Sequence, residues 1–391
     1  MKRALYLLGL LLAVGAVVAL GYFFRYRGIL PPLAPLAPET GTLPPPAAGG
    51  ALNSLPQTGG SASASGVPSP LTSVPVFSYF AKSVSDFVFI EANGHVSSFQ
   101  GGKTAVVSAS DIDNLVEATF SFDGSRILIK ERLGAHSFQF KLFDTAQKLW
   151  MPVATGTEAA AWSPNNNQLA LLSAKGSYDE LVTIDTARAS AKPQSLLQLH
   201  VSDVALLWPA SSYILLESRG SAASRGTLLA LDLKKKTLLA PLTDQLGLDS
   251  LWNSSAIRGL LFVSDDRGGG GRLSLVDQSG ASVHDLNFVT FPSKCTFGLL
   301  PQGASSTAES LVCAIPRDQE GLSLRALPDD YDKEIFSTAD DLYRIDLSRG
   351  DLTPISAGTG AFDATKLSLR NGTLFFVNRL DGKLYALSIG K

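Results

Sequence analysis

One unit recurs along most of the chain and limits the folds available to it. An apolar strand, a polar turn and a second apolar strand follow one another in residues 117–130 and again in residues 158–171. Ser121 and Ser163 hold the same place in these two copies, 42 residues apart. Weaker copies occupy residues 203–216, 248–263 and 365–377. Each copy has a polar turn, which contains Asp-Gly, Asn-Asn or Asn-Gly in residues 117–130, 158–171 and 365–377, and so predicts a β-hairpin.

A third strand is predicted after each hairpin, and it too has a recurring pattern. Apolar residues alternate up to an aspartate that ends the strand, except in the last copy, where Ser388 takes its place. These third strands lie within residues 140–146, 181–187, 228–234, 273–279, 342–348 and 384–390. Short fourth strands follow, for example in residues 238–243 and 352–357. The unit is therefore a four-stranded antiparallel sheet.

Four strands that recur about every 40–45 residues are typical of β-propeller blades. We expect an all-β domain over residues 75–391 with about seven blades, although six or eight would also suit its length. Residues 87–99 fit the first blade, and the last blade stops after its third strand. We expect residues 74–80 to supply the missing fourth strand and so leave no open sheet edge.

The N-terminal region has a different composition. Residues 4–24 form an apolar run without a charged residue, long enough for a helix that spans a bilayer. The alternative is a cleaved signal peptide, but the run is long for one and ends in an aromatic pair before Arg25. We predict a transmembrane signal-anchor helix in residues 1–27 and a flexible Pro/Gly/Ser-rich linker in residues 28–74.

The short N-terminal tail favours a single-pass cell-membrane protein with a cytoplasmic N-terminus and an extracytoplasmic propeller. The chain holds 33 Lys and Arg against 35 Asp and Glu. This balance argues against nucleic-acid binding, which normally requires a strongly basic face. The expected partners are the membrane, through the N-terminal helix, and a protein or a polymer of the cell envelope.

Cys295 and Cys313 fall on the first two predicted strands of one hairpin, 18 residues apart. Facing strands bring side chains close together, and an extracytoplasmic location is oxidising. We predict a structural disulfide; the alternative is a pair of buried free thiols.

Residues 317–341 are the longest departure from the blade period. Long loops on rigid scaffolds often bind partners, so we predict a partner-binding loop here. A solvated acidic loop without a specific role is the simpler alternative. A Ca²⁺ site is a further alternative, although no Asp-x-Asp-x-Asp-Gly spacing supports it, and we otherwise expect no cofactor. The candidate binding residues are Asp329, Asp330, Tyr331, Asp332, Glu334, Phe336, Asp340 and Asp341.

The hairpins of residues 120–129 (FSFDGSRILI) and 162–171 (WSPNNNQLAL) resemble the repeat of TolB-like, WD-like propellers. A second resemblance rests on the order Lys294-Cys295, Cys313-Ala-Ile-Pro, Leu327-Pro-Asp-Asp-Tyr and Asp340-Asp-Leu-Tyr-Arg-Ile-Asp. This order is similar to that of N-terminally anchored propeller proteins of Patescibacteria, including Parcubacteria-type bacteria, although Tyr331 and Tyr343 replace the common tryptophans. The resemblance implies a fold and a topology and brings no activity.

The sequence contains no catalytic motif that we recognise, such as the Gly-x-Ser-x-Gly of serine hydrolases. We therefore expect a non-catalytic scaffold that binds a protein or an envelope polymer. One alternative is a hydrolase or lyase that acts on peptide or glycan through the central channel of the propeller. A second alternative is a purely structural component of the cell surface.

Overall fold

The computed structural model describes residues 66–389, apart from 136, 189–190, 219, 267–268, 300–308, 349 and 359. The predicted transmembrane helix and the linker up to residue 65 lie outside these residues. Within the described part, no helix is long and apolar enough to cross a membrane.

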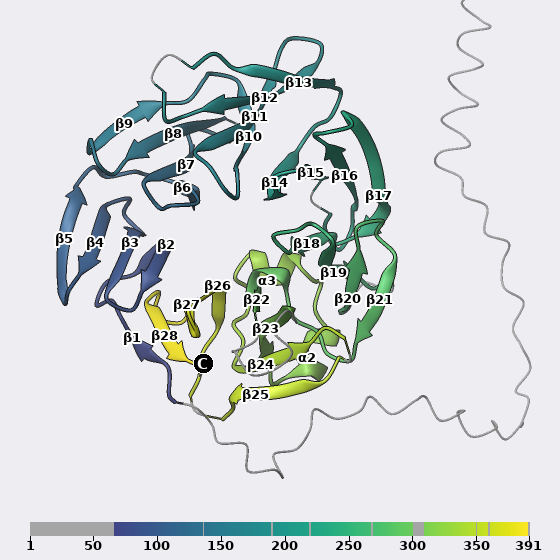
Figure 1. The fold of residues 1–391 in the computed structure, drawn as a ribbon. Helices are drawn as coiled ribbons and strands as arrows, with labels where there is room; N and C mark the ends of the chain where they lie inside the picture. The colour runs from purple at the N-terminus through teal and green to yellow at the C-terminus, as the bar shows by residue number, and fades with distance from the viewer. Residues whose placement is uncertain are drawn as a thin grey trace, which may run out of the picture. The chain divides into compact units, whose positions relative to one another are not determined.

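The described residues form seven four-stranded antiparallel sheets arranged as blades of a ring (Figure 1). Blade one comprises β2 (Val76–Ser83), β3 (Asp86–Glu91), β4 (Val96–Gln100) and β5 (Lys103–Ser108). Blade two comprises β6 (Leu115–Phe120), β7 (Arg126–Arg132), β8 (Phe138–Asp144) and β9 (Leu149–Pro152). Blade three comprises β10 (Thr157–Trp162), β11 (Gln168–Ala174), β12 (Asp179–Asp185) and β13 (Gln194–Leu199). Blade four comprises β14 (Val204–Ala210), β15 (Tyr213–Ser218), β16 (Arg225–Asp232) and β17 (Thr237–Leu246).

The last three blades complete the ring, and the first strand of each blade is the innermost one (Figure 1). Blade five comprises β18 (Asp249–Trp252), β19 (Arg258–Ser264), β20 (Gly271–Asp277) and β21 (Ser282–Leu286). Blade six comprises β22 (Cys295–Leu299), β23 (Glu309–Pro316), β24 (Asp340–Asp346) and β25 (Leu352–Ser356). Blade seven comprises β26 (Ala364–Arg370), β27 (Thr373–Asn378), β28 (Leu384–Ser388) and β1 (Ser69–Pro70). The predicted fold class, a propeller of seven four-stranded antiparallel blades, is confirmed.

The recurring aspartates act as turn formers. Asp144 ends β8, and its carboxylate accepts hydrogen bonds from the N–H groups of Ala146 and Gln147. Asp232 ends β16 and bonds Lys234 and Lys235 in the same way. A carboxylate that binds the backbone two or three residues further on fixes the turn locally. This explains why the residue recurs at that point of the unit.

The predicted Asn-Gly turn of blade seven also forms. Asn371 and Gly372 join β26 to β27 with φ angles of 49° and 73°. Positive φ at both central positions is the geometry of the type I′ turn that matches the twist of paired strands. Asparagine and glycine are the residues that adopt it most readily.

The strand that closes the ring differs from the predicted one. Ser69 and Pro70 of β1 pair with Ala386 and Tyr385 of β28, so β1 is the outermost strand of blade seven (Figure 1). The expectation that residues 74–80 would close the ring is wrong, because Val76 begins β2, the innermost strand of blade one. The predicted linker therefore contains the closing strand. A proline is tolerated there because the N–H it lacks would point away from the sheet.

The hydrophobic core is divided among the seams between blades. Seven buried apolar clusters are present in the described residues, and each joins two neighbouring blades. One of them packs Phe87 and Phe89 of blade one against Phe375 and Leu384 of blade seven. The last seam thus has a packed interior like the others, which holds the ring closed together with the short β1 pairing.

Candidate functional site

The insertion in blade six forms a structured strap. Residues 317–339, called here the blade-six strap, connect β23 to β24 and contain the helices α2 (Gln319–Ser323) and α3 (Asp329–Asp332). The strap lies against the loops of two other blades. The N–H of Gly270 in blade five donates to the carbonyl of Arg325 over 2.8 Å, and the N–H of Ala222 in blade four donates to Asp329 over 2.9 Å. These contacts hold the strap against the propeller.

A buried lysine lies beneath the strap. Lys294 precedes β22 and is 0% exposed. Its Nζ donates to Asp340 and Asp363 over 2.6 Å each and to the Thr338 hydroxyl over 2.9 Å. Asp363 belongs to blade seven, whereas Thr338 belongs to the strap. The lysine therefore connects two blades and the strap at a single point.

Tyr331 of α3 extends this cluster. Its hydroxyl donates to Asp363 over 2.7 Å, and its ring stacks on Phe291 with centroids 4.4 Å apart. On blade seven, the Arg379 guanidinium lies 4.1 Å from the Tyr331 ring centroid. A guanidinium over an aromatic ring is attracted by the electrons of its face. Two cations thus accompany the two carboxylates: Lys294, which is buried, and Arg379, which is half-buried and also pairs with Glu334.

The two carboxylates of the cluster differ. Burial raises the pKa of Asp340, and the neighbouring Lys294 offsets only part of that effect. Burial also acts on Asp363, but Lys294, Tyr331 and the Thr338 N–H all donate to it and together hold its pKa below the ordinary value. Asp340 Oδ1, in contrast, is buried and accepts no hydrogen bond from the described residues. Asp363 is therefore the better stabilised anion.

Two of the predicted binding residues lie in the interior of the protein. Tyr331 is 4% exposed and Asp340 is 3% exposed, so neither can touch a partner. Their burial argues against direct contact with a partner: Tyr331 of the strap donates to Asp363, and Asp340 at the start of β24 accepts a hydrogen bond from Lys294. Both act as anchors of the strap.

The other predicted residues lie at or near the surface. Asp329 binds the Ala222 N–H, Asp330 accepts a hydrogen bond from the Ala326 N–H, and Asp341 forms an ion pair with Arg317. Phe336 is half-buried against Tyr331, whereas Asp332 and Glu334 are exposed. In the part of the chain that the structure describes, no three Asp, Glu, His or Cys side chains converge as metal ligands would. The acidic residues of the strap thus point in different directions.

Four residues of the cluster were missed by sequence reasoning as members of a site: Lys294, Thr338, Asp363 and Arg379. Lys294 was noted only as part of a resemblance. A lysine in an otherwise apolar stretch, followed by an acidic insertion, is the one signal that could have indicated a buried ion pair. Asp363 and Arg379 carry no such signal, because they lie in another blade.

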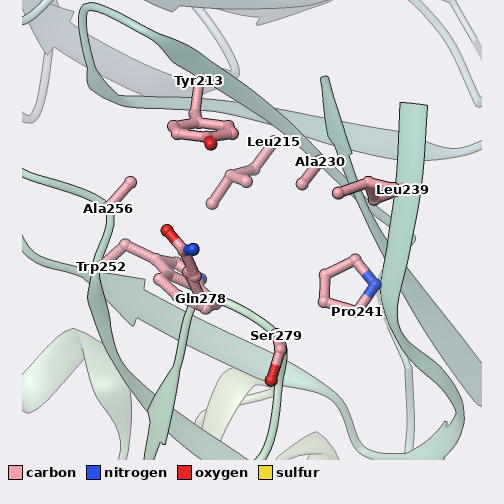
Figure 2. Close-up of a pocket in the computed structure, with 9 residues that line it drawn as sticks. All are labelled: Tyr213, Leu215, Ala230, Leu239, Pro241, Trp252, Ala256, Gln278 and Ser279. Carbon is pink, nitrogen blue, oxygen red and sulfur yellow. The ribbon is translucent and has the colours of Figure 1, made fainter. Parts of the chain in front are cut away.

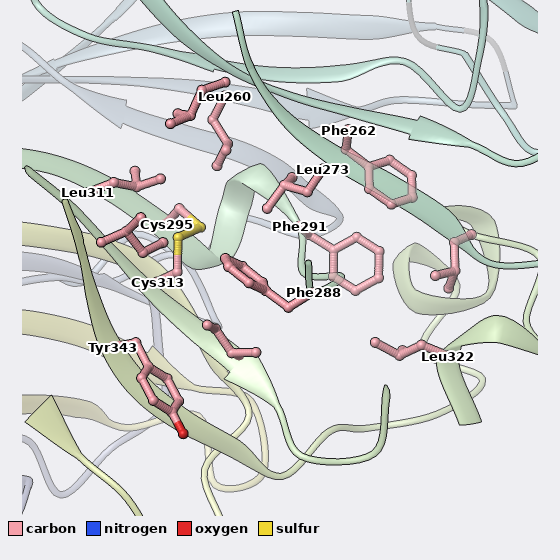
Figure 3. Packing of buried hydrophobic residues seen from close by; sticks show 14 of the residues in the cluster. Leu260, Phe262, Leu273, Phe288, Phe291, Cys295, Leu311, Cys313, Leu322 and Tyr343 are labelled. Atoms are coloured by element: carbon pink, nitrogen blue, oxygen red, sulfur yellow. A yellow bond between two sulfur atoms is a disulfide. The ribbon is translucent and has the colours of Figure 1, made fainter. Parts of the chain in front are cut away.

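The disulfide lies in the seam between blades five and six. Cys295 of β22 and Cys313 of β23 are direct partners in the strand register and are joined by a disulfide. Figure 3 shows the bond among the apolar side chains of this seam, with Leu311 beside it. Both residues are buried, which supports a structural role for the bond and not a catalytic one.

Two apolar side chains of the strap are strongly exposed. Leu324 is 85% exposed and Ile335 is 60% exposed. Between α2 and the end of the strap lies a cavity of about 280 Å³ that Arg325 and Phe336 help to line. The Arg325 guanidinium lies 4.9 Å from the Phe336 ring centroid. This combination of exposed aliphatic side chains, an aromatic ring and an arginine is suited to protein contacts.

A second, smaller cavity lies between blades four and five. Figure 2 shows Tyr213 on one side of it and Trp252 with Gln278 on the other, while Leu239 and Pro241 of β17 form a third wall. Its volume is about 120 Å³, and none of its nine lining residues is charged. A space of this size and character can accept a single apolar side chain.

No family model matches the chain, and no curated protein matches it. The fold is similar to several solved structures. An oligogalacturonate lyase from Vibrio parahaemolyticus shares 8% identity at a TM-score of 0.55, over 83% of this chain and 94% of that one. A prolyl endopeptidase shares 12% identity at a TM-score of 0.52, over 82% of this chain and 49% of that one, so this chain spans about half its length.

TolB from Acinetobacter baumannii shares 14% identity over 53% of each chain, at a TM-score of 0.38 that is too low to support an argument. At such identities, the likenesses to the lyase and the endopeptidase concern the fold alone. The lyase and the endopeptidase are enzymes with different chemistries, so the likeness to them assigns no activity to this chain. What they establish is that residues 66–389 fold as a β-propeller.

Proposed function

We propose that this protein is a non-catalytic, membrane-anchored scaffold whose propeller lies outside the cytoplasm and binds a protein or an envelope polymer. The contact surface is the outer face of the blade-six strap. The N-terminal apolar run and the linker support the anchored arrangement, as does the resemblance to anchored propellers in the order of residues from Lys294 to Asp346.

One observation carries the proposal. The strap is fixed by the buried Lys294 cluster, yet its Leu324 and Ile335 side chains are exposed to solvent. The free energy falls when a partner covers an aliphatic side chain that was exposed to water. Because the strap is already ordered, little conformational entropy is lost when that happens. A rigid, partly apolar surface is what a binding scaffold requires.

Site-specific photo-crosslinking in the native membrane tests this proposal. A photoreactive amino acid is placed at Ile335 in the full chain, and the matched control is Val106 on the outer strand of blade one. Both side chains are 60% exposed, so the accessibility of the probe is the same. We expect one discrete adduct from position 335 and none from position 106. Equal labelling at the two positions, or none at either, would contradict a binding role for the strap.

A matched pair of substitutions gives the second arm. We expect Leu324→Asp to abolish the adduct from position 335, because a charge in the contact must lose its water. Val106→Asp, at the control position, should leave the adduct unchanged. If Leu324→Asp has no effect on the adduct, Leu324 is not part of the contact, and a contact surface that includes both residues is contradicted.

A further inference from the structure

The central channel contains a cavity of its own. Its walls come from the innermost strands of three consecutive blades, β26, β2 and β6, which lie side by side at the inner edge of the ring (Figure 1). The cavity has a volume of about 460 Å³. Sites for small molecules usually have volumes of about 300–1,000 Å³, so this one is large enough for a ligand.

Lys366 is the one cation among the residues that line this cavity, and an unusual backbone presents it. Its φ angle is 54°, in the left-handed region that lysine rarely adopts. The pairing of β26 with β27 shifts register between Thr365 and Ser368, so Lys366 lies in a β-bulge. Bulges redirect side chains and are frequent next to binding sites. The Tyr79 hydroxyl holds this conformation, since it donates to the Lys366 carbonyl over 2.6 Å.

The ammonium of Lys366 is only partly satisfied by the protein. Nζ donates to the Phe77 carbonyl and lies 4.3 Å from the centroid of the Phe77 ring. An ammonium has three N–H donors, so two remain for a ligand. The side chain is exposed to the channel, but the surrounding walls displace water and lower the pKa of Lys366 to about 8, an effect that Glu117 partly offsets. At neutral pH the Lys366 ammonium is therefore mostly charged.

Glu117 supplies the opposite charge. It lies on β6, across β2 from Lys366, and is half-buried in the wall of the same cavity. Ser78, Thr119 and Ser368 are also among the residues that line the cavity. A ligand with several negative charges would be repelled by Glu117, and a purely cationic one by Lys366. A ligand with one charge of each sign would meet an opposite charge at both places.

We propose that this channel cavity binds a small zwitterion of the amino-acid or short-peptide class. Its carboxylate contacts Lys366, its ammonium contacts Glu117, and its backbone polar groups contact the hydroxyls between them. The Phe77 ring forms an apolar wall. This site is separate from the blade-six strap, so neither proposal depends on the other.

Calorimetric titration of the full chain in detergent at pH 7 tests the proposal. The zwitterionic probes are glycine, glycylglycine and triglycine, a series in which the distance between the two charges increases. Two capped peptides serve as controls: N-acetylglycylglycine, which keeps only the carboxylate, and glycylglycinamide, which keeps only the ammonium. We expect at least one zwitterion to bind with a dissociation constant of about 1 mM or lower, and each capped peptide to bind at least tenfold more weakly than the best zwitterion.

Substitutions locate the site. We expect Lys366→Met and Glu117→Gln each to weaken binding of the best probe at least tenfold. Lys103→Met and Glu320→Gln remove the same charges at exposed positions outside the channel and should change nothing. Lys366→Met also removes the contact to the Phe77 carbonyl, so the fold of this variant is checked by circular dichroism. If Lys366→Met unfolds, the binding measured with Glu117→Gln tests the site.

Three results would overturn the proposal. The first is that no zwitterion of the series binds with a dissociation constant of about 1 mM or lower. The second is that a capped peptide binds as well as the zwitterion. The third is that Glu117→Gln binds like the wild type. A failure of crosslinking at the strap would leave each of these measurements unaffected, so the two proposals are judged separately.

Discussion

Lys294 Nζ and Asp363 Oδ1 lie 2.6 Å apart in the protein interior, although 69 positions separate the two residues in the chain. The ion pair crosses from blade six to blade seven and lies directly beneath the strap. Burying two charges costs solvation energy, which their attraction and additional hydrogen bonds must offset. Tyr331 and Thr338 of the strap supply such bonds to Asp363. The strap and the ion pair therefore depend on each other.

Removal of the lysine should destabilise the propeller strongly. In Lys294→Met, two buried carboxylates lose their common partner, and we expect the free energy of unfolding to fall by about 3–5 kcal/mol. Urea unfolding of residues 53–391, the compact unit that contains the propeller, measures this. Lys333→Met, at an exposed position of the strap, is the control and should change stability by less than about 0.5 kcal/mol. A similar loss in both variants would show that the ion pair has no special role.

The two aspartates should differ in what they contribute at low pH. The pKa of Asp363 is below its ordinary value in the folded state, so its stabilising effect is present above about pH 4 and is lost as the pH falls further. The pKa of Asp340 is raised, so the charged form of this residue opposes folding at neutral pH and protonation relieves that effect. We expect Asp363→Asn to cost more stability at pH 7 than Asp340→Asn.

Melting temperatures of both variants and the wild type between pH 7 and pH 3 test this difference. Asp363→Asn should reduce the loss of stability below about pH 4, because it removes one of the carboxylates whose pKa is lowered by folding. Asp340→Asn should leave that loss in place. The opposite order of the two variants would mean that Asp340 is the better stabilised anion.

The disulfide should stabilise the fold by an amount that depends on the length of chain it closes. Cys295 and Cys313 are 18 residues apart, and closing a loop of that length stabilises a fold by about 3 kcal/mol in the chain-entropy description. We expect a loss of this size in the double variant Cys295→Ala/Cys313→Ala, measured by urea unfolding. A reductant should lower the stability of the wild type and have no effect on the double variant. If the reductant affects both equally, its action does not involve this bond.

The same bond reports on the location of the propeller. Alkylation of intact native membranes, followed by denaturation, should find Cys295 and Cys313 protected as a disulfide, because the compartment outside the cytoplasm is oxidising. Free thiols at both positions would contradict an extracytoplasmic propeller. Burial of the two cysteines does not hide free thiols from this measurement, since alkylation is repeated after unfolding. Alkylation of the unfolded chain without reduction labels free thiols, and alkylation after reduction labels the cysteines of the disulfide.

The closing strand makes a prediction about fragments. A chain that begins at residue 75 lacks β1 and leaves the edge of β28 unpaired, whereas one that begins at residue 53 keeps it. The chain that begins at residue 75 also loses the hydrogen bond from the Leu71 N–H to the Leu384 carbonyl. We expect the shorter fragment to be less stable by about 1–3 kcal/mol, at about 1 kcal/mol per lost hydrogen bond, and to associate through its free edge. Urea unfolding and light scattering of the two fragments measure both effects, and equal behaviour would show that β1 is dispensable.

Much of the fold could be predicted because it is encoded locally. The hairpins depend on turns such as Asn371-Gly372, and the third strands depend on aspartates such as Asp144 that bond their own turns. These interactions span only a few residues, so they leave a visible pattern in the chain. The closing strand was missed because Ser69-Pro70 carries no strand pattern and is recognised only by the partner that it meets.

The site was less accessible to such reasoning. Tyr331 and Asp340 belong to an acidic, aromatic segment that reads as a surface loop, yet both are buried. Asp329, in the same segment, meets Ala222 from 107 positions away. Such contacts are made between blades, and the local sequence does not predict which loops become neighbours when the ring closes.

The sequence by itself determined the repeating unit and indicated about seven blades, because alternation and turn chemistry act between residues close together in the chain. Only the tertiary structure decided which strand closes the ring and which charged residues leave the surface. Those choices depend on the free energy of bringing distant segments together, as in the pairing of Lys294 with Asp363. Closure of the ring into seven packed seams makes that pairing available, and no local pattern specifies it.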